Sequence, residues 1–183
     1  MSEETEARLA DGSSPATPEE LLAFLEEMGV AATTHHHPPV HTVEEAQALK
    51  GDLPGAHTKN LFLRDKKGRM WLLVALRDRS VDLKALAPTL GARGRLSFGS
   101  RQRLMRFLGV YPGSVTPFAV INDGSGAVTV ALDEGLRDQE IWNAHPLVNT
   151  MTTAVSREDM LRFLEAVEHP PVWVNLEPPV AGP

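Results

Sequence analysis

Apolar residues recur at helical spacing in several short segments of the chain. Leu21, Leu25 and Met28 share one helix face, and a capping box at Thr17 and Glu20 precedes them. This pattern predicts a helix that starts just after the capping threonine. Similar signals predict further helices over residues 42–51, 82–87, 100–108 and 156–167, of which the second stops before a proline.

Short apolar runs between these helices predict β-strands. Residues 59–64 and 70–76, joined by a link that contains Gly68, predict a β-hairpin. Helices and strands are mixed without regular alternation, so the predicted fold class is α+β rather than a doubly wound parallel sheet. The shorter predicted strands lie at residues 96–98, 118–121, 127–132, 141–144 and 151–155.

The 183 residues, 42% of them hydrophobic, are enough for one domain with a buried core. We expect a disordered N-terminal extension over residues 1–16, a folded domain over 17–175 and a flexible tail over 176–183. The chain has no cysteine, which excludes disulfides, a thiol nucleophile and a cysteine zinc site. The acidic start and the short apolar runs predict a cytoplasmic protein that does not bind membranes.

Charge is unevenly distributed along the chain. The formal net charge is −6, which argues against indiscriminate binding to DNA or RNA. Residues 83–122 nevertheless carry six basic side chains and no acidic one. This stretch is either a local positive field that meets phosphates or a solvated arginine-rich surface, and charge alone does not separate the two.

A histidine cluster lies between the first two predicted helices. His35, His36, His37 and His41 are of a residue type that binds zinc. No acidic residue or cysteine stands nearby to complete a tetrahedral site, so we expect no metal and interpret the cluster as a polar strand end before a proline turn. The common nucleotide-binding, serine-hydrolase and metalloprotease motifs are absent from the sequence.

Three other segments carry candidate chemistry. Lys59 and Asn60 stand at the start of an apolar strand, where a lysine can bind phosphate and an asparagine can donate and accept hydrogen bonds. Residues 113–117 form a glycine-to-proline loop that can approach a ligand closely. His145 can act as an acid, a base or a donor. Taken singly, each also fits an ordinary structural role.

Together and in this order, the motifs resemble the YbaK/prolyl-tRNA synthetase-associated domain, a superfamily of aminoacyl-tRNA editing proteins. The likeness is closest to its free-standing branch, called PrdX or ProXp-ala, and covers residues 18–168. It is carried by Thr42-Val-Glu-Glu-Ala-Gln, Gly55-Ala-His-Thr-Lys-Asn-Leu-Phe-Leu-Arg-Asp-Lys-Lys-Gly68, Leu96-Ser-Phe98, Leu108-Gly-Val110, Pro112-Gly-Ser-Val-Thr-Pro-Phe118, Ile121-Asn-Asp123 and Asn143-Ala-His-Pro-Leu-Val-Asn-Thr150.

The resemblance implies a mixed, mostly antiparallel sheet or barrel-like core surrounded by helices. It also implies trans-editing, in which the ester of mischarged Ala-tRNA(Pro) is hydrolysed without a cofactor. Alanine is smaller than proline, and a missing methylene gives the synthetase only ~1–3 kcal/mol of discrimination. The implied partners are the acceptor end of tRNA(Pro) and, beyond it, prolyl-tRNA synthetase or an elongation factor.

The resemblance also assigns roles to individual residues. Lys59 and Asn60 would hold the tRNA 3′ end and the aminoacyl group, and His145 would limit the pocket or place the attacking water. The helix opened by Thr42 would approach the acceptor end. The amino-acid pocket would be lined by Gly113, Ser114, Val115, Thr116 and Pro117, and acceptor-stem contacts are hypothesised for Arg101, Arg103 and Lys66.

Two alternatives to an Ala-tRNA(Pro) deacylase stay open at this point. The same fold can act on Cys-tRNA(Pro) or on an error with serine or threonine, depending on pocket volume around Val115, Thr116 and His145. A non-catalytic module that binds tRNA or a synthetase is the third interpretation. In that case, alanine at Lys59 would weaken binding and not chemistry.

Overall fold

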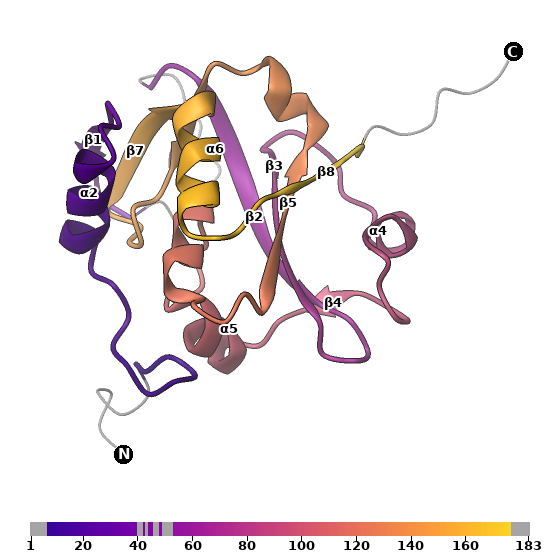
Figure 1. Cartoon of the computed structure of the whole chain (residues 1–183). Helices are drawn as coiled ribbons and strands as arrows, with labels where there is room; N and C mark the ends of the chain where they lie inside the picture. The colour runs from indigo at the N-terminus through magenta and orange to yellow at the C-terminus, as the bar shows by residue number, and fades with distance from the viewer. Residues whose placement is uncertain (1–6, 40–41, 43, 46–47, 49–52, 177–183) are drawn as a thin grey trace, which may run out of the picture.

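The fold combines one large sheet with four α-helices and two 3-10 helices in the part of the chain that the structure describes. This computed structural model describes residues 7–39, 42, 44–45, 48 and 53–176 (Figure 1). The helices are α2 (Pro18–Glu27), α4 (Leu83–Leu90), α5 (Arg101–Leu108), η1 (Pro117–Asn122), η2 (Glu134–Asp138) and α6 (Arg157–Ala166). The strands are β1 (Thr33–His36), β2 (Ala56–Arg64), β3 (Met70–Leu76), β4 (Ser97–Phe98), β5 (Val128–Asp133), β6 (Ile141–Ala144), β7 (Met151–Ser156) and β8 (Val172–Val174).

The strands form an eight-stranded sheet in the order β1-β7-β6-β2-β3-β5-β8, with β4 paired to β2. The pairs β1–β7, β7–β6, β2–β3 and β2–β4 are antiparallel, whereas β2–β6, β3–β5 and β5–β8 are parallel. The predicted α+β fold with a mixed, mostly antiparallel sheet is therefore confirmed. The sheet is open, with β1 and β8 at its two ends.

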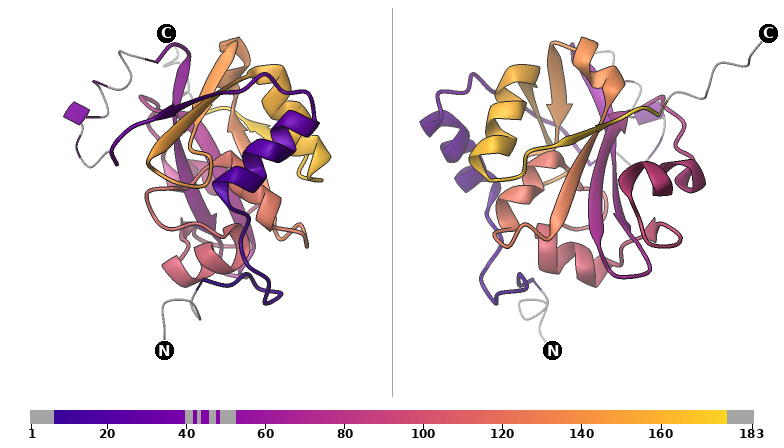
Figure 2. Two further views of the ribbon diagram at one scale, coloured as in Figure 1. Left: turned by 90° about the vertical axis from the view of Figure 1, so that its left-hand side faces the viewer. Right: turned by 45° about the vertical axis from the view of Figure 1, so that its right-hand side comes forward.

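The two faces of the sheet carry unequal layers of helix. Helices α2, α5 and α6, together with η1, cover one face, and α4 covers the other (Figure 2). The larger core lies under the three helices, where Phe163 of α6 packs edge-on against Phe118 of η1 at 5.3 Å between ring centroids. Leu86 of α4 belongs to the smaller core with Leu63 and Leu73.

Strand β2 occupies the centre of the sheet and has β3 along one side. On its other side β6 pairs only with Ala56 and His57, and β4 pairs only with Leu63 and Arg64. Within the described residues, positions 58–61 of β2 therefore pair with one neighbour only. This opening in the sheet contains Lys59 and Asn60, two of the candidate site residues.

The capping signals in the sequence are confirmed. Thr17 accepts a hydrogen bond from the Glu20 N–H at 3.1 Å, and the Glu20 carboxylate accepts one from the Thr17 N–H at 3.3 Å. Ser100 and Ser156 cap α5 and α6 in the same way. The predicted β2–β3 hairpin also forms.

One predicted strand, residues 118–121, is instead the 3-10 helix η1. Thr116 caps this helix by accepting a hydrogen bond from the Phe118 N–H at 3.3 Å, and Pro117 provides the fixed φ of a first helical position. Phe118, Ala119 and Val120 are all buried, so the segment shows no polar face. A short, wholly apolar run gives no periodicity that separates helix from strand.

Two further elements differ from the sequence-based expectation. Helix α4 continues past Pro88 to Leu90, because its caps at Asp82 and Gly91 lie on either side of the proline. The helix loses one internal hydrogen bond there, at an exposed position. Strand β8 was not predicted; it is three residues long and directly follows two prolines.

Residues 7–16 contact the domain, although the sequence suggested disorder over residues 1–16. Leu9 is buried, and the Ala10 N–H donates to the carbonyl of Arg106 at 2.8 Å. The Ala16 N–H donates to the side-chain oxygen of Asn122 at 2.8 Å. Residues 1–6 and the predicted tail beyond residue 176 lie outside the described residues, and the domain limits remain predictions.

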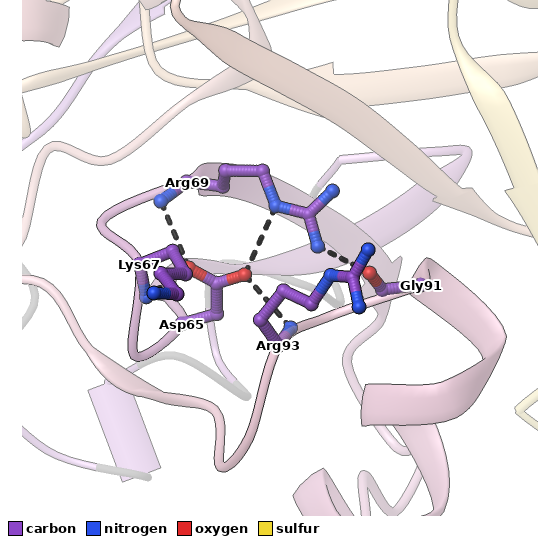
Figure 3. A network of polar contacts seen from close by, with 5 residues as sticks. All are labelled: Asp65, Lys67, Arg69, Gly91 and Arg93. Carbon is purple, nitrogen blue, oxygen red and sulfur yellow. Dashed lines mark hydrogen bonds and ion pairs between the residues drawn. The ribbon is translucent and has the colours of Figure 1, made fainter.

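A buried carboxylate fixes the turn between β2 and β3 (Figure 3). Asp65 accepts hydrogen bonds from the backbone N–H groups of Lys67, Arg69 and Arg93, each at 2.9 Å. The Arg69 side chain pairs with it at 3.0 Å and also donates to the Gly91 carbonyl. Burial alone would raise the pKa of Asp65, but these donors outweigh it and lower the pKa to about 2.

We predict that Asp65→Asn lowers the melting temperature by several degrees at neutral pH. An amide cannot accept all four hydrogen bonds, so backbone donors lose partners. Because the folded pKa is lowered, the stabilisation is present above the unfolded pKa and is lost as the pH falls toward about 2. Thermal unfolding followed from neutral to acid pH should therefore show a steeper decline for the wild type than for the variant. Parallel curves would contradict the prediction.

Candidate active site

The middle of β2 presents Lys59 and Asn60 at the opening in the sheet. Asn60 pairs with Val74 of the larger core, and Lys59 pairs with Ala75 one position along. Since side chains alternate along a strand, Asn60 points to the face covered by α2, α5 and α6, and Lys59 points to the face of α4. Both side chains are half-buried. A ligand that reaches both has to enter through the edge of β2.

Asn60 has a hydrogen-bond acceptor without a partner. Its side-chain oxygen is buried, and no donor in the described part of the chain reaches it. A buried polar atom left unsatisfied costs about 1–3 kcal/mol, so such groups usually have a reason. A ligand N–H or O–H placed at the edge of β2 would satisfy this oxygen.

The parallel pairing of β2 with β6 brings Lys59 and His145 to one side of the sheet. His57 pairs with Asn143, and β6 ends one residue later at Ala144. Lys59 and His145 each lie two residues beyond that pair. Their positions therefore continue the same face, at the point where the two strands separate.

The His145 ring is oriented by the backbone of β7. Its Nδ1 lies 2.8 Å from the carbonyl oxygen of Met151, so Nδ1 carries a proton and donates it. Burial lowers the pKa of His145, and the charges of His37 and Arg77 lower it further against the raising effect of the Met151 carbonyl. The ring is therefore neutral near pH 7, which leaves Nε2 with a lone pair that can accept a proton from water.

His37 stands beside His145, with 6.3 Å between the ring centroids. Its Nε2 lies 2.8 Å from the hydroxyl of Thr152, and its Nδ1 lies 2.8 Å from the Pro38 carbonyl. The histidine cluster is thus the end of β1, as the sequence suggested. No group of three metal-binding side chains occurs in the described residues, and His41 lies outside them.

The loop of residues 113–117 lies against the segment that follows His145. Gly113 has a φ of 94°, and a Cβ placed on it would be 3.7 Å from the side-chain nitrogen of Asn149. Ser114, Thr116 and Pro117 are buried, whereas Val115 is half-buried. The Ser114 N–H donates to the Tyr111 carbonyl at 3.0 Å, so it is not free to stabilise an oxyanion. The described approach of the loop to the segment after His145 is the one between Gly113 and Asn149.

The chain matches the family of aminoacyl-tRNA editing domains over residues 37–163, more than half of its length. It belongs to this family. A prolyl-tRNA editing protein, ProX, of Acetoanaerobium sticklandii is 37% identical over 147 residues, covering 80% of this chain and 89% of its own. The zebrafish (Danio rerio) prolyl-tRNA synthetase associated domain-containing protein 1 is 36% identical over 183 residues, covering 97% and 99% of the two chains.

Solved structures show the same fold at low sequence identity. The crystal structure of a candidate trans-editing enzyme for prolyl-tRNA synthetase superposes with a TM-score of 0.67 at 17% identity, covering 90% of this chain and 99% of the other. A hypothetical protein, APE2540, gives 0.66 at 17% identity, covering 85% and 97%. These structures support the fold. The family match and the relatives confirm the resemblance inferred from the motifs and the predicted enzyme class, a hydrolase that deacylates aminoacyl-tRNA. None of the described helices has the length and apolar character needed to cross a bilayer.

Thr42 of this editing domain makes the predicted capping box. Its hydroxyl accepts a hydrogen bond from the Glu45 N–H at 3.1 Å, and the Glu45 carboxylate accepts one from the Thr42 N–H at 3.3 Å. The rest of the predicted helix 42–51 lies largely outside the described residues. The role of Thr42 in substrate binding stays a prediction.

Arg101 and Arg103 belong to α5 and Lys66 to the β2–β3 turn, and both elements lie at the lower edge of the domain in Figure 1. The Arg101 guanidinium stands over the Tyr111 ring at 5.4 Å, and an Arg103 nitrogen lies 4.0 Å from the sulfur of Met70. Lys66 is exposed, and its backbone N–H donates to the Arg93 carbonyl at 3.0 Å.

Three site residues were missed by the sequence reasoning. Asn143 donates from its side chain to the carbonyls of Pro54 and Ala56 at 2.9 and 3.2 Å, and its oxygen is buried without a partner in the described chain. His37, directly after β1, and Arg77, directly after β3, both lower the pKa of His145. The Asn143-Ala-His145 motif was the available signal for Asn143. His37 and Arg77 come close to His145 only because the strands pair in the sheet.

We predict that Gly113→Ala lowers the deacylation activity of this editing domain, although the substitution adds only one methyl group. A left-handed φ costs a non-glycine residue about 1–2 kcal/mol, so the loop will shift or lose stability. We expect kcat/KM for deacylation to fall by about tenfold, which corresponds to ~1.4 kcal/mol. Gly124→Ala is the matched control, because its φ is ordinary and nothing lies within 4 Å of the added Cβ. Equal activity of the two variants would contradict the prediction.

Proposed function

We propose that the protein is a trans-editing deacylase that hydrolyses the alanyl ester of Ala-tRNA(Pro). The relatives named above are described by prolyl-tRNA editing or by association with prolyl-tRNA synthetase, and this chain spans nearly all of each. Alanine is the small amino acid that a proline pocket excludes least well, since size alone gives limited discrimination. The proposed site of action is the cytoplasm, where charged tRNA is used.

The observation that carries the proposal is the side-chain oxygen of Asn60, which has no partner in the described residues. Asn60 adjoins Lys59 in the part of β2, positions 58–61, that pairs with one neighbouring strand only. The 3′-terminal ribose and the aminoacyl group of the substrate carry O–H and N–H donors that suit this oxygen. The ammonium group of Lys59 suits the adjoining phosphate. A strand edge with one acceptor and one cation thus matches the chemistry of an aminoacylated RNA end.

Hydrolysis of the ester requires an aligned water and a stabilised oxyanion. Neutral His145 has Nε2 available as the proton acceptor, while its Nδ1 is held by Met151. In the proposed step, water adds to the ester carbonyl as His145 takes its proton. The proton then passes to the leaving ribose oxygen as the carbon–oxygen bond breaks, which frees alanine and tRNA. The adjacent ribose hydroxyl would share this proton transfer, as the family resemblance implies.

The loop of residues 113–117 would set which amino acid enters. Thr116 is fully buried and caps η1, so it shapes the loop and takes no part in the chemistry. Val115 is half-buried and is the side chain best placed to meet a substrate methyl group. Thr42 is proposed to help bind the substrate, and Arg101, Arg103 and Lys66 are the proposed contacts to tRNA outside the pocket. Prolyl-tRNA synthetase and an elongation factor are the proposed further partners.

The proposal is tested by a deacylation panel with tRNA(Pro) that carries alanine, cysteine, serine or proline. We expect rapid loss of alanine only, with His145→Ala and Asn60→Ala both slower than the wild type. Preference for cysteine or serine would keep the site and change the substrate. If no ester is hydrolysed while tRNA still binds, the protein is a binding module and the proposal fails.

A further inference from the structure

A basic groove runs between α5 and the N-terminal segment. It has a volume of about 830 Å³ and contains four arginines in its lining, namely Arg8, Arg101, Arg103 and Arg106, with no acidic residue among them. The exposed Tyr111 also lines it. So much positive charge in one concave surface raises the local concentration of anions.

None of these guanidinium groups has a carboxylate partner in the described part of the chain. Arg8 donates to the Gly12 carbonyl at 3.4 Å and to the Ser14 hydroxyl at 3.3 Å. Arg101 and Arg106 stand over aromatic rings, at 5.4 Å from Tyr111 and 5.9 Å from Phe107. Within the described residues they therefore lack the ion pairs with aspartates that Arg69, Arg79 and Arg162 make.

Tyr111 gives the groove an aromatic platform next to the candidate active site. Half of its surface is exposed, and only one residue separates it from Gly113. An exposed ring combined with an arginine is a common arrangement for binding unpaired nucleotides, because a base stacks on the ring and a phosphate pairs with the cation.

The N-terminal segment forms a fixed wall of the groove. Leu9 is buried, and Ala10 donates its N–H to the carbonyl of Arg106, whose own side chain lines the groove. The segment thereby holds Arg8 across from α5. A segment that the sequence suggested to be disordered thus supplies one of the four cations.

We propose that this groove binds the unpaired 3′ nucleotides of the tRNA, with one base stacked on Tyr111 and phosphates held by Arg8, Arg101 and Arg106. The inference rests on the proposed function only in taking a tRNA 3′ end as the substrate. Because only Pro112 separates Tyr111 from the loop of residues 113–117, a base held there delivers the terminal ester toward that loop. Duplex RNA, whose bases are already stacked on each other, does not use the ring.

The decisive experiment measures the dissociation constant for uncharged tRNA(Pro) with and without its unpaired 3′ nucleotides. Tyr111→Ala should weaken binding of intact tRNA by at least about fivefold and leave binding of the shortened tRNA unchanged. Tyr111→Phe keeps the stacking ring and should bind like the wild type. Phe98→Ala is the matched control, since Phe98 is even more exposed, at 63%, but does not line the groove.

A second measurement tests the phosphate contacts. Arg101→Ala and Arg106→Ala should each reduce the slope of log affinity against log salt by about 0.7, the value for one contact to single-stranded nucleic acid. Arg137→Ala is the control, because this arginine also stacks on a ring, 3.9 Å from the centroid of Trp173, outside the groove. It should leave the slope unchanged.

The outcomes separate this inference from the proposed function. If alanine is hydrolysed normally while Tyr111→Ala binds both RNAs like the wild type, the groove proposal is overturned and the function stands. An equal loss on intact and shortened tRNA also overturns it. If no alanyl ester is hydrolysed but the loss is confined to intact tRNA, the groove proposal holds and the assigned substrate is wrong.

Discussion

Lys59→Ala is expected to lower kcat/KM for Ala-tRNA(Pro) by about 10- to 100-fold without unfolding the protein, because a hydrogen bond to a charged group contributes about 1.5–3 kcal/mol. Lys59 is half-buried, and β2 stays anchored by Phe62 and Leu63, which are almost completely buried. The loss should therefore concern substrate binding and positioning. Single-turnover deacylation, with circular dichroism as the check on folding, measures it.

Two variants sharpen this prediction. Lys59→Arg retains the charge and should recover part of the activity, since a guanidinium also binds phosphate but has a different shape. Lys67→Ala removes an exposed lysine of the β2–β3 turn and should have little effect. If Lys59→Ala binds uncharged tRNA less tightly but hydrolyses the bound ester at the wild-type rate, Lys59 contributes to tRNA binding alone. Full activity would remove Lys59 from the site.

The fold was predictable where the sequence carries local signals. The capping boxes, the glycine in the hairpin link and the apolar periodicity of α2, α5 and α6 each act over a few residues, and all three were read correctly. The strand predicted over residues 118–121 was wrong, because a buried segment lacks the polar positions that reveal a helical or strand period. Strand β8 was not predicted, because its three residues are held extended by parallel pairing with β5, which leaves no local signal in the sequence.

The candidate site shows the same limit. Lys59, Asn60, Gly113 and His145 stood out because each lies in a recognisable motif, although their joint role remains a prediction. The sequence did not show that Lys59 and Asn60 point to opposite faces of one strand. Nor did it show that His37 lies beside His145, since that contact depends on the pairing of β1 with β7. Residues brought together by strand pairing leave no local signature.

The second large effect is expected at a buried ion pair below η1. His169 Nε2 lies 2.9 Å from an Asp123 carboxylate oxygen, and both side chains are almost fully buried. The same carboxylate accepts hydrogen bonds from the N–H groups of Ala127 and Val128, at 3.2 and 2.8 Å. Asp123 therefore ties the end of η1 to β5 and to the segment after α6.

Both groups are shifted toward their charged forms. Burial would lower the pKa of His169, but the hydrogen bond to Asp123 and the Val167 carbonyl raise it. Burial would raise the pKa of Asp123, but hydrogen bonds from His169, Val128 and Ala127 lower it. The histidine contribution is thus fully present below its unfolded pKa of about 6.5 and is lost as the pH rises through the folded value. The aspartate contribution is present above about pH 4 and is lost as the pH falls.

Asp123→Asn should therefore reduce the free energy of unfolding by about 3 kcal/mol near pH 5.5, because removing one partner of a buried pair leaves the other charge uncompensated. For a chain of this length that corresponds to a melting temperature lower by about 6–12 °C. The difference between wild type and variant should shrink as the pH rises through the raised pKa of His169. Urea unfolding over this pH range measures both effects, with the exposed Asp138→Asn as control. A difference that is small, or constant with pH, would mean that the pair contributes no ionic stabilisation to the fold.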